Sequence, residues 1–187
     1  MHAVRVLNER NLSACFFIIP SFVESQNQKE FYLKNIRPIV NPFIEEYEED
    51  FTSLSWEDLE NISKKHLIGP HTLNHTMNAG NTDKDFLSEE IIESKIILEK
   101  KLNLKIDSFC SINNTLLSVN SESKEIINSF YSFHFTTIAG CNKELADPHF
   151  IKRINTECFW TIGAVKFSLG NMNLRRQKSK IKEFNSL

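Results

Sequence analysis

Two histidines, His71 and His75, are the residues whose type and spacing could carry chemistry. They lie four positions apart and directly follow a short apolar run that we predict to be a strand. Imidazoles at this spacing can turn to the same side of a helical turn and share one divalent ion. Neutral imidazole suits zinc, cobalt, nickel and iron, so the spacing does not select the metal. The alternative is a capped helix start with two polar side chains, and the pair alone does not decide between the two.

Apolar runs that could be strands recur along the chain and alternate with helical patterns. Residues 12–19 are nearly all apolar, which is typical of a strand buried on both faces, and Pro20 ends the run. Shorter candidate strands lie at residues 67–69, 106–110, 134–138, 151–154 and 162–169. This alternation predicts an α/β fold with a mainly parallel sheet, in which chemistry gathers at the C-terminal ends of the strands. The two histidines follow such an end.

Two predicted helices have clear local signals. Ser55 and Asp58 have the form of a capping box, which predicts a helix that ends near His66. Residues 85–102 have the pattern of an amphipathic helix whose buried face consists of Leu87, Ile91, Leu98 and Leu102. The charged residues between them, including Glu90, are expected on its solvent side. Further helices are predicted at residues 121–131 and at the basic C-terminal end.

Composition limits the classes of protein that need to be considered. The 187 residues are 41% hydrophobic and 25% charged, which is the balance of one globular domain, and we expect residues 1–187 to form it. The net charge of -2 gives no reason to expect nucleic acid as a partner, and the basic residues at 175–182 are predicted to form a solvated face. No secretory signal and no apolar run of about 20 residues is present, which predicts a cytoplasmic protein without a membrane span.

The surroundings of the histidine pair resemble the NodB-type polysaccharide deacetylases. The matching blocks follow the family's order and spacing, and they lie at residues 13–18, 54–59, 66–75, 90–99, 135–140 and 153–154. The first of these blocks contains the Phe16-Phe17 pair of a family strand. The resemblance implies a distorted (β/α) barrel that removes acetyl groups from N-acetylated glycans. It also implies a divalent metal, with zinc first and cobalt, nickel or iron as alternatives. His71 and His75 match the family's two metal-binding histidines.

The chain departs from the family where carboxylates are needed. In the family, a segment of the Thr-Phe-Asp-Asp-Gly type precedes the Phe-Phe strand and supplies one metal ligand and the general base. Here no Asp precedes Asp50, so the resemblance implies that the first strand is missing, and we assign no catalytic residue. We expect the chain to be truncated at its N-terminus, with Met1 an internal methionine of a longer frame. The nearest acids after the pair, Asp83 and Asp85, are expected at the start of the next helix.

A second departure concerns the groove in which the family binds its substrate. Ile112 stands where a proline is expected, and Asn113 and Asn114 replace the residues that follow. Two hypotheses therefore stay open: a metal-dependent glycan deacetylase with impaired turnover, or a catalytically inactive glycan-binding or structural remnant of that family. The sequence names neither the glycan nor the oligomeric state.

Overall fold

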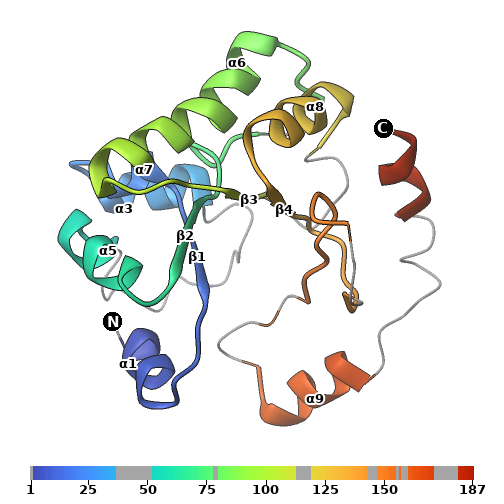
Figure 1. Ribbon diagram of the computed structural model, residues 1–187. Helices are drawn as coiled ribbons and strands as arrows, with labels where there is room; N and C mark the ends of the chain where they lie inside the picture. The colour runs from blue at the N-terminus through green and yellow to red at the C-terminus, as the bar shows by residue number, and fades with distance from the viewer. Residues whose placement is uncertain are drawn as a thin grey trace.

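The computed structural model describes residues 2–36, 52–77, 80–112, 119–142, 147–154, 156, 160–170 and 181–187, and Figure 1 shows their arrangement. The helices are α1 (His2–Glu9), α2 (Pro20–Glu24), α3 (Gln28–Phe31), α5 (Trp56–Ser63), α6 (Lys84–Ser88), α7 (Ser94–Leu102), α8 (Ser121–Phe130) and α9 (Ile162–Gly170). Two segments are π-helical: η1 (Tyr32–Ile36) continues α3, and η2 (Glu89–Glu93) joins α6 to α7. The strands are β1 (Cys15–Ile18), β2 (Leu67–Pro70), β3 (Ser108–Cys110) and β4 (Phe133–Phe135).

The strands pair in parallel, as predicted for an α/β fold. β1 pairs with β2, with Cys15 opposite Leu67, and β3 pairs with β4, with Ser108 opposite Phe133. β4 continues through a single parallel bridge to Ile151. Within the described ranges these strands form two separate two-stranded sheets. The α/β class is therefore confirmed, whereas the distorted (β/α) barrel stays a prediction.

Gly69 allows β2 to pass close to β3. A Cβ atom at this position would lie 2.5 Å from the carbonyl oxygen of Ser108 and 3.0 Å from the ring of Phe17. The first neighbour is backbone and cannot turn away, so the two sheets would have to separate.

We expect Gly69→Ala to lower the free energy of unfolding by about 2–3 kcal/mol, because overpacking against backbone forces the strands apart. Urea unfolding followed by circular dichroism measures the change. Gly163→Ala is the matched control, since a Cβ in that helix meets its nearest atom at 3.7 Å. There we expect a gain of about 0.5–1 kcal/mol from helix propensity. Equal effects of the two substitutions would contradict the close approach of β2 and β3.

The helical predictions with strong local signals are confirmed. The capping box at the start of α5 is present, with the Asp58 amide donating to Ser55 Oγ at 3.1 Å and the Ser55 amide to Asp58 Oδ2 at 3.0 Å. The Ser55 amide and the Ser55 hydroxyl both donate to the carboxylate of Asp58, and these two hydrogen bonds lower its pKa below the usual value. The predicted buried face of the 85–102 helix is also correct, because its members are 0–6% exposed: Leu87, Ile91, Leu98 and Leu102.

Two segments differ from the sequence predictions. Residues 162–169, predicted as a strand, lie in helix α9, because a short apolar run fits either structure when only its hydrophobicity is considered. Of the run 151–154, only Ile151 makes a strand bridge. The basic residues at 171–180 and the pair Asn113-Asn114 lie outside the described residues.

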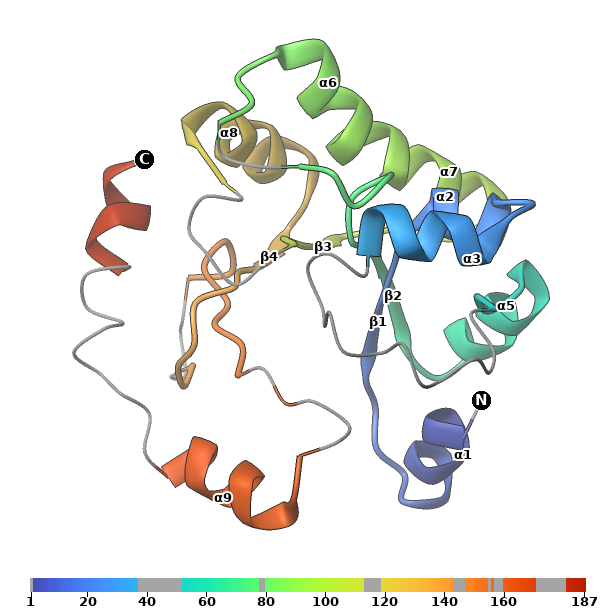
Figure 2. The ribbon, with the colours of Figure 1, turned by 180° about the vertical axis from the view of Figure 1, so that it is seen from behind.

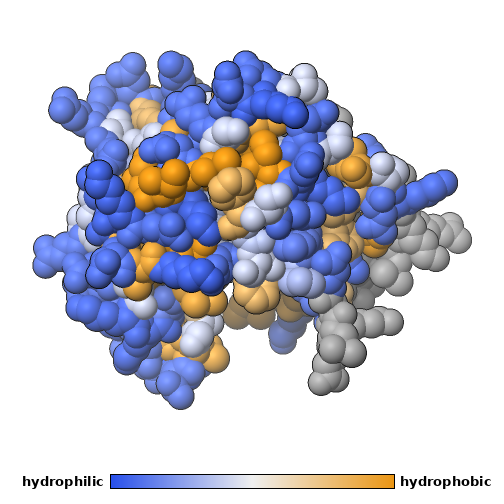
Figure 3. All heavy atoms as spheres, turned by 45° about the horizontal axis from the view of Figure 1, so that its top comes forward, coloured by the Kyte–Doolittle hydropathy of each residue, from blue (hydrophilic) through white to orange (hydrophobic). Residues whose placement is uncertain are grey.

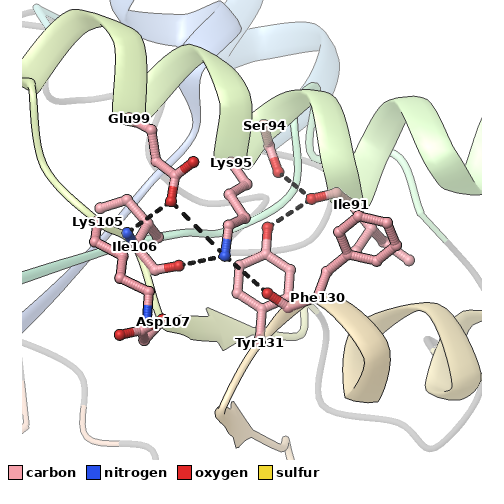
Figure 4. A network of polar contacts seen from close by, with 9 residues as sticks. All are labelled: Ile91, Ser94, Lys95, Glu99, Lys105, Ile106, Asp107, Phe130 and Tyr131. Atoms are coloured by element: carbon pink, nitrogen blue, oxygen red, sulfur yellow. Dashed lines mark hydrogen bonds and ion pairs between the residues drawn. The ribbon is translucent and has the colours of Figure 1, made fainter.

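Helix α7 is held by a lysine that contacts the backbone of the segment before β3 and of the end of α8 (Figure 4). Lys95 Nζ donates to the carbonyl oxygen of Ile106 at 2.6 Å and to that of Phe130 at 2.7 Å. Tyr131 Oη donates to the carbonyl oxygen of Ile91 at 2.6 Å. These contacts fix the orientation of the 84–102 helical region, which also matters for the site described below.

The outer surface agrees with the ordinary composition of the chain. The face in Figure 3 is mainly hydrophilic, and hydrophobic side chains gather in areas between hydrophilic ones. Within the described part of the chain, no helix combines the length and the apolar character that crossing a membrane requires. The described cysteines Cys15, Cys110 and Cys141 are free thiols, and burial raises the pKa of Cys110 to about 12.

Candidate metal site

His71 and His75 lie in a tight loop at the C-terminal end of β2. The backbone amide of His71 donates to the carbonyl oxygen of Ile18 at 2.7 Å, so the loop starts where β1 and β2 end together. The two imidazole centroids are 5.2 Å apart, with an angle of 54° between the ring planes. The structure therefore brings the predicted pair together.

The histidines converge by a route that differs from the predicted helical turn. Thr72 has φ 65° and His75 has φ 61°, both in the left-handed region that residues with a Cβ seldom adopt. The side chain of Thr72 accepts the backbone amide of His75 at 2.9 Å, which fixes the turn between them. A β-branched residue in this conformation costs of the order of 1 kcal/mol or more, so the surrounding contacts must hold the loop in place.

The hydrogen bonds of both rings define their tautomers. His71 Nδ1 lies 2.8 Å from the carbonyl oxygen of Cys110, and His75 Nδ1 lies 3.0 Å from that of Asn35. Because a carbonyl oxygen only accepts, both Nδ1 atoms carry the proton and both Nε2 atoms carry the lone pair. This is the usual arrangement in metal sites, where the nitrogen that is not a ligand donates to backbone or carboxylate.

Burial keeps both imidazoles neutral. Burial, together with the smaller effects of the neighbouring His75 and the guanidinium of Arg153, lowers the pKa of His71 to about 3, although the hydrogen bond to Cys110 opposes this. Burial also lowers the pKa of His75, although the hydrogen bond to Asn35 and the charge of Glu90 oppose this. Both rings are thus in the form that binds a cation.

Glu90 holds the histidine loop from the helical side. Its carboxylate accepts the amide of Asn74 at 3.2 Å, the Asn74 side chain at 2.8 Å and the Thr76 hydroxyl at 3.1 Å. Its own carbonyl oxygen accepts the amide of Leu73 at 3.0 Å. Glu90 is 1% exposed, so its predicted place on the solvent side of the helix was wrong. Its position three residues after Leu87, at the margin of the apolar stripe, is the signal that could have indicated burial.

Three other residues singled out by their sequence context lie away from the histidine pair or belong to the packed interior. Asp83 caps α6 by accepting the amides of Asp85 and Phe86, as expected for the start of a helix. Ile112 is 1% exposed and belongs to the core. His134 is fully buried in β4, with its Nε2 2.6 Å from Ser111 Oγ. In the part of the chain that the structure describes, no set of three His, Cys, Asp or Glu side chains is placed to hold an ion.

No family model and no curated protein sequence matches the chain. Solved structures do match. The deacetylase PplD of Streptococcus pyogenes superposes with a TM-score of 0.62 at 15% identity, over 89% of this chain and 62% of that one. The deacetylase domain of BpsB from Bordetella bronchiseptica gives 0.61 at 14% identity, over 81% and 64%. A polysaccharide deacetylase from Bacillus cereus gives 0.60 at 18% identity, over 90% and 47%.

This chain spans less than two thirds of the length of each of these three proteins. At identities below 20% the likeness concerns the arrangement of the backbone. The chain has the fold of the NodB-type polysaccharide deacetylases.

Proposed function

We propose that this chain is a polysaccharide deacetylase-like protein whose site for hydrolysing N-acetyl groups of glycans is built around a divalent ion bound by His71 and His75. The observation that carries the proposal is the geometry of the two rings. Each donates from Nδ1 to a backbone carbonyl, and the ring centroids are 5.2 Å apart at the C-terminal end of β2. Two neutral Nε2 atoms in this setting fit zinc first, and cobalt, nickel or iron as alternatives.

The two imidazoles supply part of a metal site, and a further ligand has to come from outside the described side chains. A divalent ion in such a site lowers the pKa of a bound water and polarises the amide carbonyl of the substrate. The chain's own contribution is to hold two lone pairs in position. The burial that lowers the pKa of both histidines keeps these lone pairs free of protons.

A second candidate, a glycan-binding relative without turnover, is supported by the groove region. Ile112 is buried where the family presents a proline to its substrate, and no Asp occurs before Asp50. For this reason we expect little or no acetate release from N-acetylglucosamine oligomers by this chain. Rapid metal-dependent release would instead establish a competent enzyme.

Titration with cobalt tests the metal site directly. We expect His71→Ala and His75→Ala each to weaken binding by roughly 100-fold or more, because a single remaining imidazole is a poor ligand set. His149→Ala is the matched control, since Nε2 of His149 is hydrogen-bonded to the carbonyl oxygen of Tyr131 and the residue lies in another segment. Absence of cobalt binding in the wild type, or equal binding in all four proteins, would refute the proposed site.

A further inference from the structure

We propose that a cavity at the N-terminal ends of β2 and β3, beside β4, binds a small uncharged aromatic molecule that carries one hydroxyl group. The cavity measures about 560 Å³, which falls in the range of small-ligand pockets. Its walls come from the end of α5, from β2, from residues 104–107 before β3, and from β4. Figure 1 and Figure 2 show α5 beside β2 from two opposite sides. His71 follows the other end of β2, so the inference goes beyond the proposed function and does not depend on it.

The cavity lies where β2 and β3 separate. At Gly69 the two strands are in close contact, because a Cβ atom there would lie 2.5 Å from the carbonyl oxygen of Ser108. Leu67 and Ile68, which precede Gly69 in β2, instead line the cavity together with residues 104–107. Among the residues that the structure describes, β2 and β3 belong to different sheets, so no backbone ladder draws these segments together.

The wall of the cavity is mainly apolar and partly open to solvent. Three of its lining side chains are large, apolar and exposed: Leu67 at 64%, Phe133 at 44% and Leu104 at 37%. Large apolar side chains that gather around one cavity indicate a binding site, whereas isolated ones do not. Phe135 adds a second ring, whose centroid lies 5.0 Å from that of Phe17. Two phenylalanines in one wall favour an aromatic ligand, because aromatic rings pack well against each other.

His66 supplies the polar group of the cavity. The residue is 4% exposed, and neither of its ring nitrogens has a hydrogen-bond partner in the described part of the chain. A neutral imidazole has one donor and one acceptor nitrogen, and leaving them unpaired in the interior is unfavourable. A hydroxyl group both donates and accepts, so it can pair with either nitrogen. The ring of Phe16 packs edge-on against the imidazole, with centroids 5.4 Å apart.

The charged residues of the wall favour an uncharged ligand. Lys105 Nζ lies 3.0 Å from Asp107 Oδ1, so the two charges oppose each other. Lys105 is also well exposed, and water screens its charge. A carboxylate or ammonium group would lose its hydration in this mainly apolar cavity and gain little in return.

The segment before β3 is held in place by contacts outside the cavity. The backbone amide of Ile106 donates to Glu99 Oε1 at 2.9 Å, and its carbonyl oxygen accepts Lys95 Nζ at 2.6 Å. The carbonyl oxygen of Asp107 accepts the amide of Phe133 at 3.0 Å. A ligand therefore binds to a wall that is already ordered, which lowers the entropic cost of binding.

Titration with three related molecules tests the proposal. The probes are 2-naphthol, naphthalene, which lacks the hydroxyl group, and 2-naphthoate, which is anionic, and amide NMR shifts report their binding at pH 7. We expect 2-naphthol to shift the amides of Ile68, Lys105 and Phe133. Naphthalene and 2-naphthoate should each bind roughly fivefold more weakly or worse, because one cannot pair with His66 and the other carries a charge.

Two cavity variants separate the hydrogen bond from the space. His66→Phe keeps an aromatic ring against Phe16 but removes both nitrogens, and should weaken 2-naphthol roughly fivefold while leaving naphthalene unchanged. Ser63→Trp fills the cavity and should weaken both molecules by roughly tenfold or more, which keeps the test valid if His66→Phe folds poorly.

Ser129→Trp is the matched control and should leave binding unchanged. Like Ser63, Ser129 donates its hydroxyl to a carbonyl oxygen of its own helix, but it does not line the cavity. Failure of 2-naphthol to bind the wild type, or shifts confined to the histidine loop, overturns the proposal. Equal affinity for the three probes, or equal binding by Ser63→Trp and Ser129→Trp, also overturns it.

Discussion

Replacing Glu90 with alanine is expected to lower the free energy of unfolding by about 3 kcal/mol, because it removes a buried carboxylate that accepts three hydrogen bonds from the histidine loop. The donors are the backbone amide and side chain of Asn74 and the hydroxyl of Thr76. Glu90→Gln should cost less, since its amide oxygen still accepts one of them. Urea unfolding at pH 7 measures both changes.

Glu89→Ala is the matched control, because Glu89 is the preceding residue of the same helical segment and is exposed. It should change the free energy of unfolding by no more than about 0.5 kcal/mol. Under conditions where all variants are folded, Glu90→Ala should also weaken cobalt binding, since the loop that carries His75 loses its anchor. If Glu90→Ala and Glu89→Ala destabilise the protein equally, the carboxylate of Glu90 does not hold the loop.

The parts of the fold that depend on neighbouring residues could be predicted from the sequence. The capping box of α5 needs only Ser55 and Asp58, three positions apart, and the buried face of the 84–102 helical region follows from helical periodicity. The parallel pairing followed from apolar runs alternating with helices. In each case the deciding interaction is local or repeats regularly along the chain.

The details of the site depend on contacts between distant residues. His71 receives its orientation from Cys110, 39 residues away, and His75 from Asn35, 40 residues away. The residue type of Thr72 does not predict its left-handed conformation, because contacts with surrounding residues stabilise that conformation. Spacing therefore identified the two histidines but gave the wrong local structure for the loop.

Helix α9 illustrates the same limit. Its sequence contains Ile162, Val165, Phe167 and Leu169, and such a short apolar run is compatible with a strand or a helix. The side chains of Ile162 and Phe167 are 76% and 69% exposed. The strand prediction for this segment assumed that its apolar side chains are buried against a sheet, and the structure leaves these two side chains exposed.

Acid is expected to destabilise the protein through His134, a buried imidazole outside the proposed metal site. Its Nε2 is paired with Ser111 Oγ, and its Nδ1 finds no partner among the residues that the structure describes. Burial lowers its pKa to about 3, and the positive charges of His149, Arg153 and Lys124 act in the same direction. In the unfolded chain a histidine titrates near pH 6.5.

The sign of the effect follows from proton binding. Between about pH 6.5 and pH 3 the unfolded chain holds a proton on this residue and the folded chain does not, so stability falls as the pH falls through this window. The slope from one such group approaches about 1.4 kcal/mol per pH unit. Urea unfolding from pH 7 to pH 4 measures it, and His134→Phe should show a smaller slope even though it costs stability at pH 7. Carboxylates titrate alike in both proteins and cancel in the comparison. Parallel pH profiles would show that His134 accepts its proton without unfolding, and that water reaches its ring more readily than its complete burial implies.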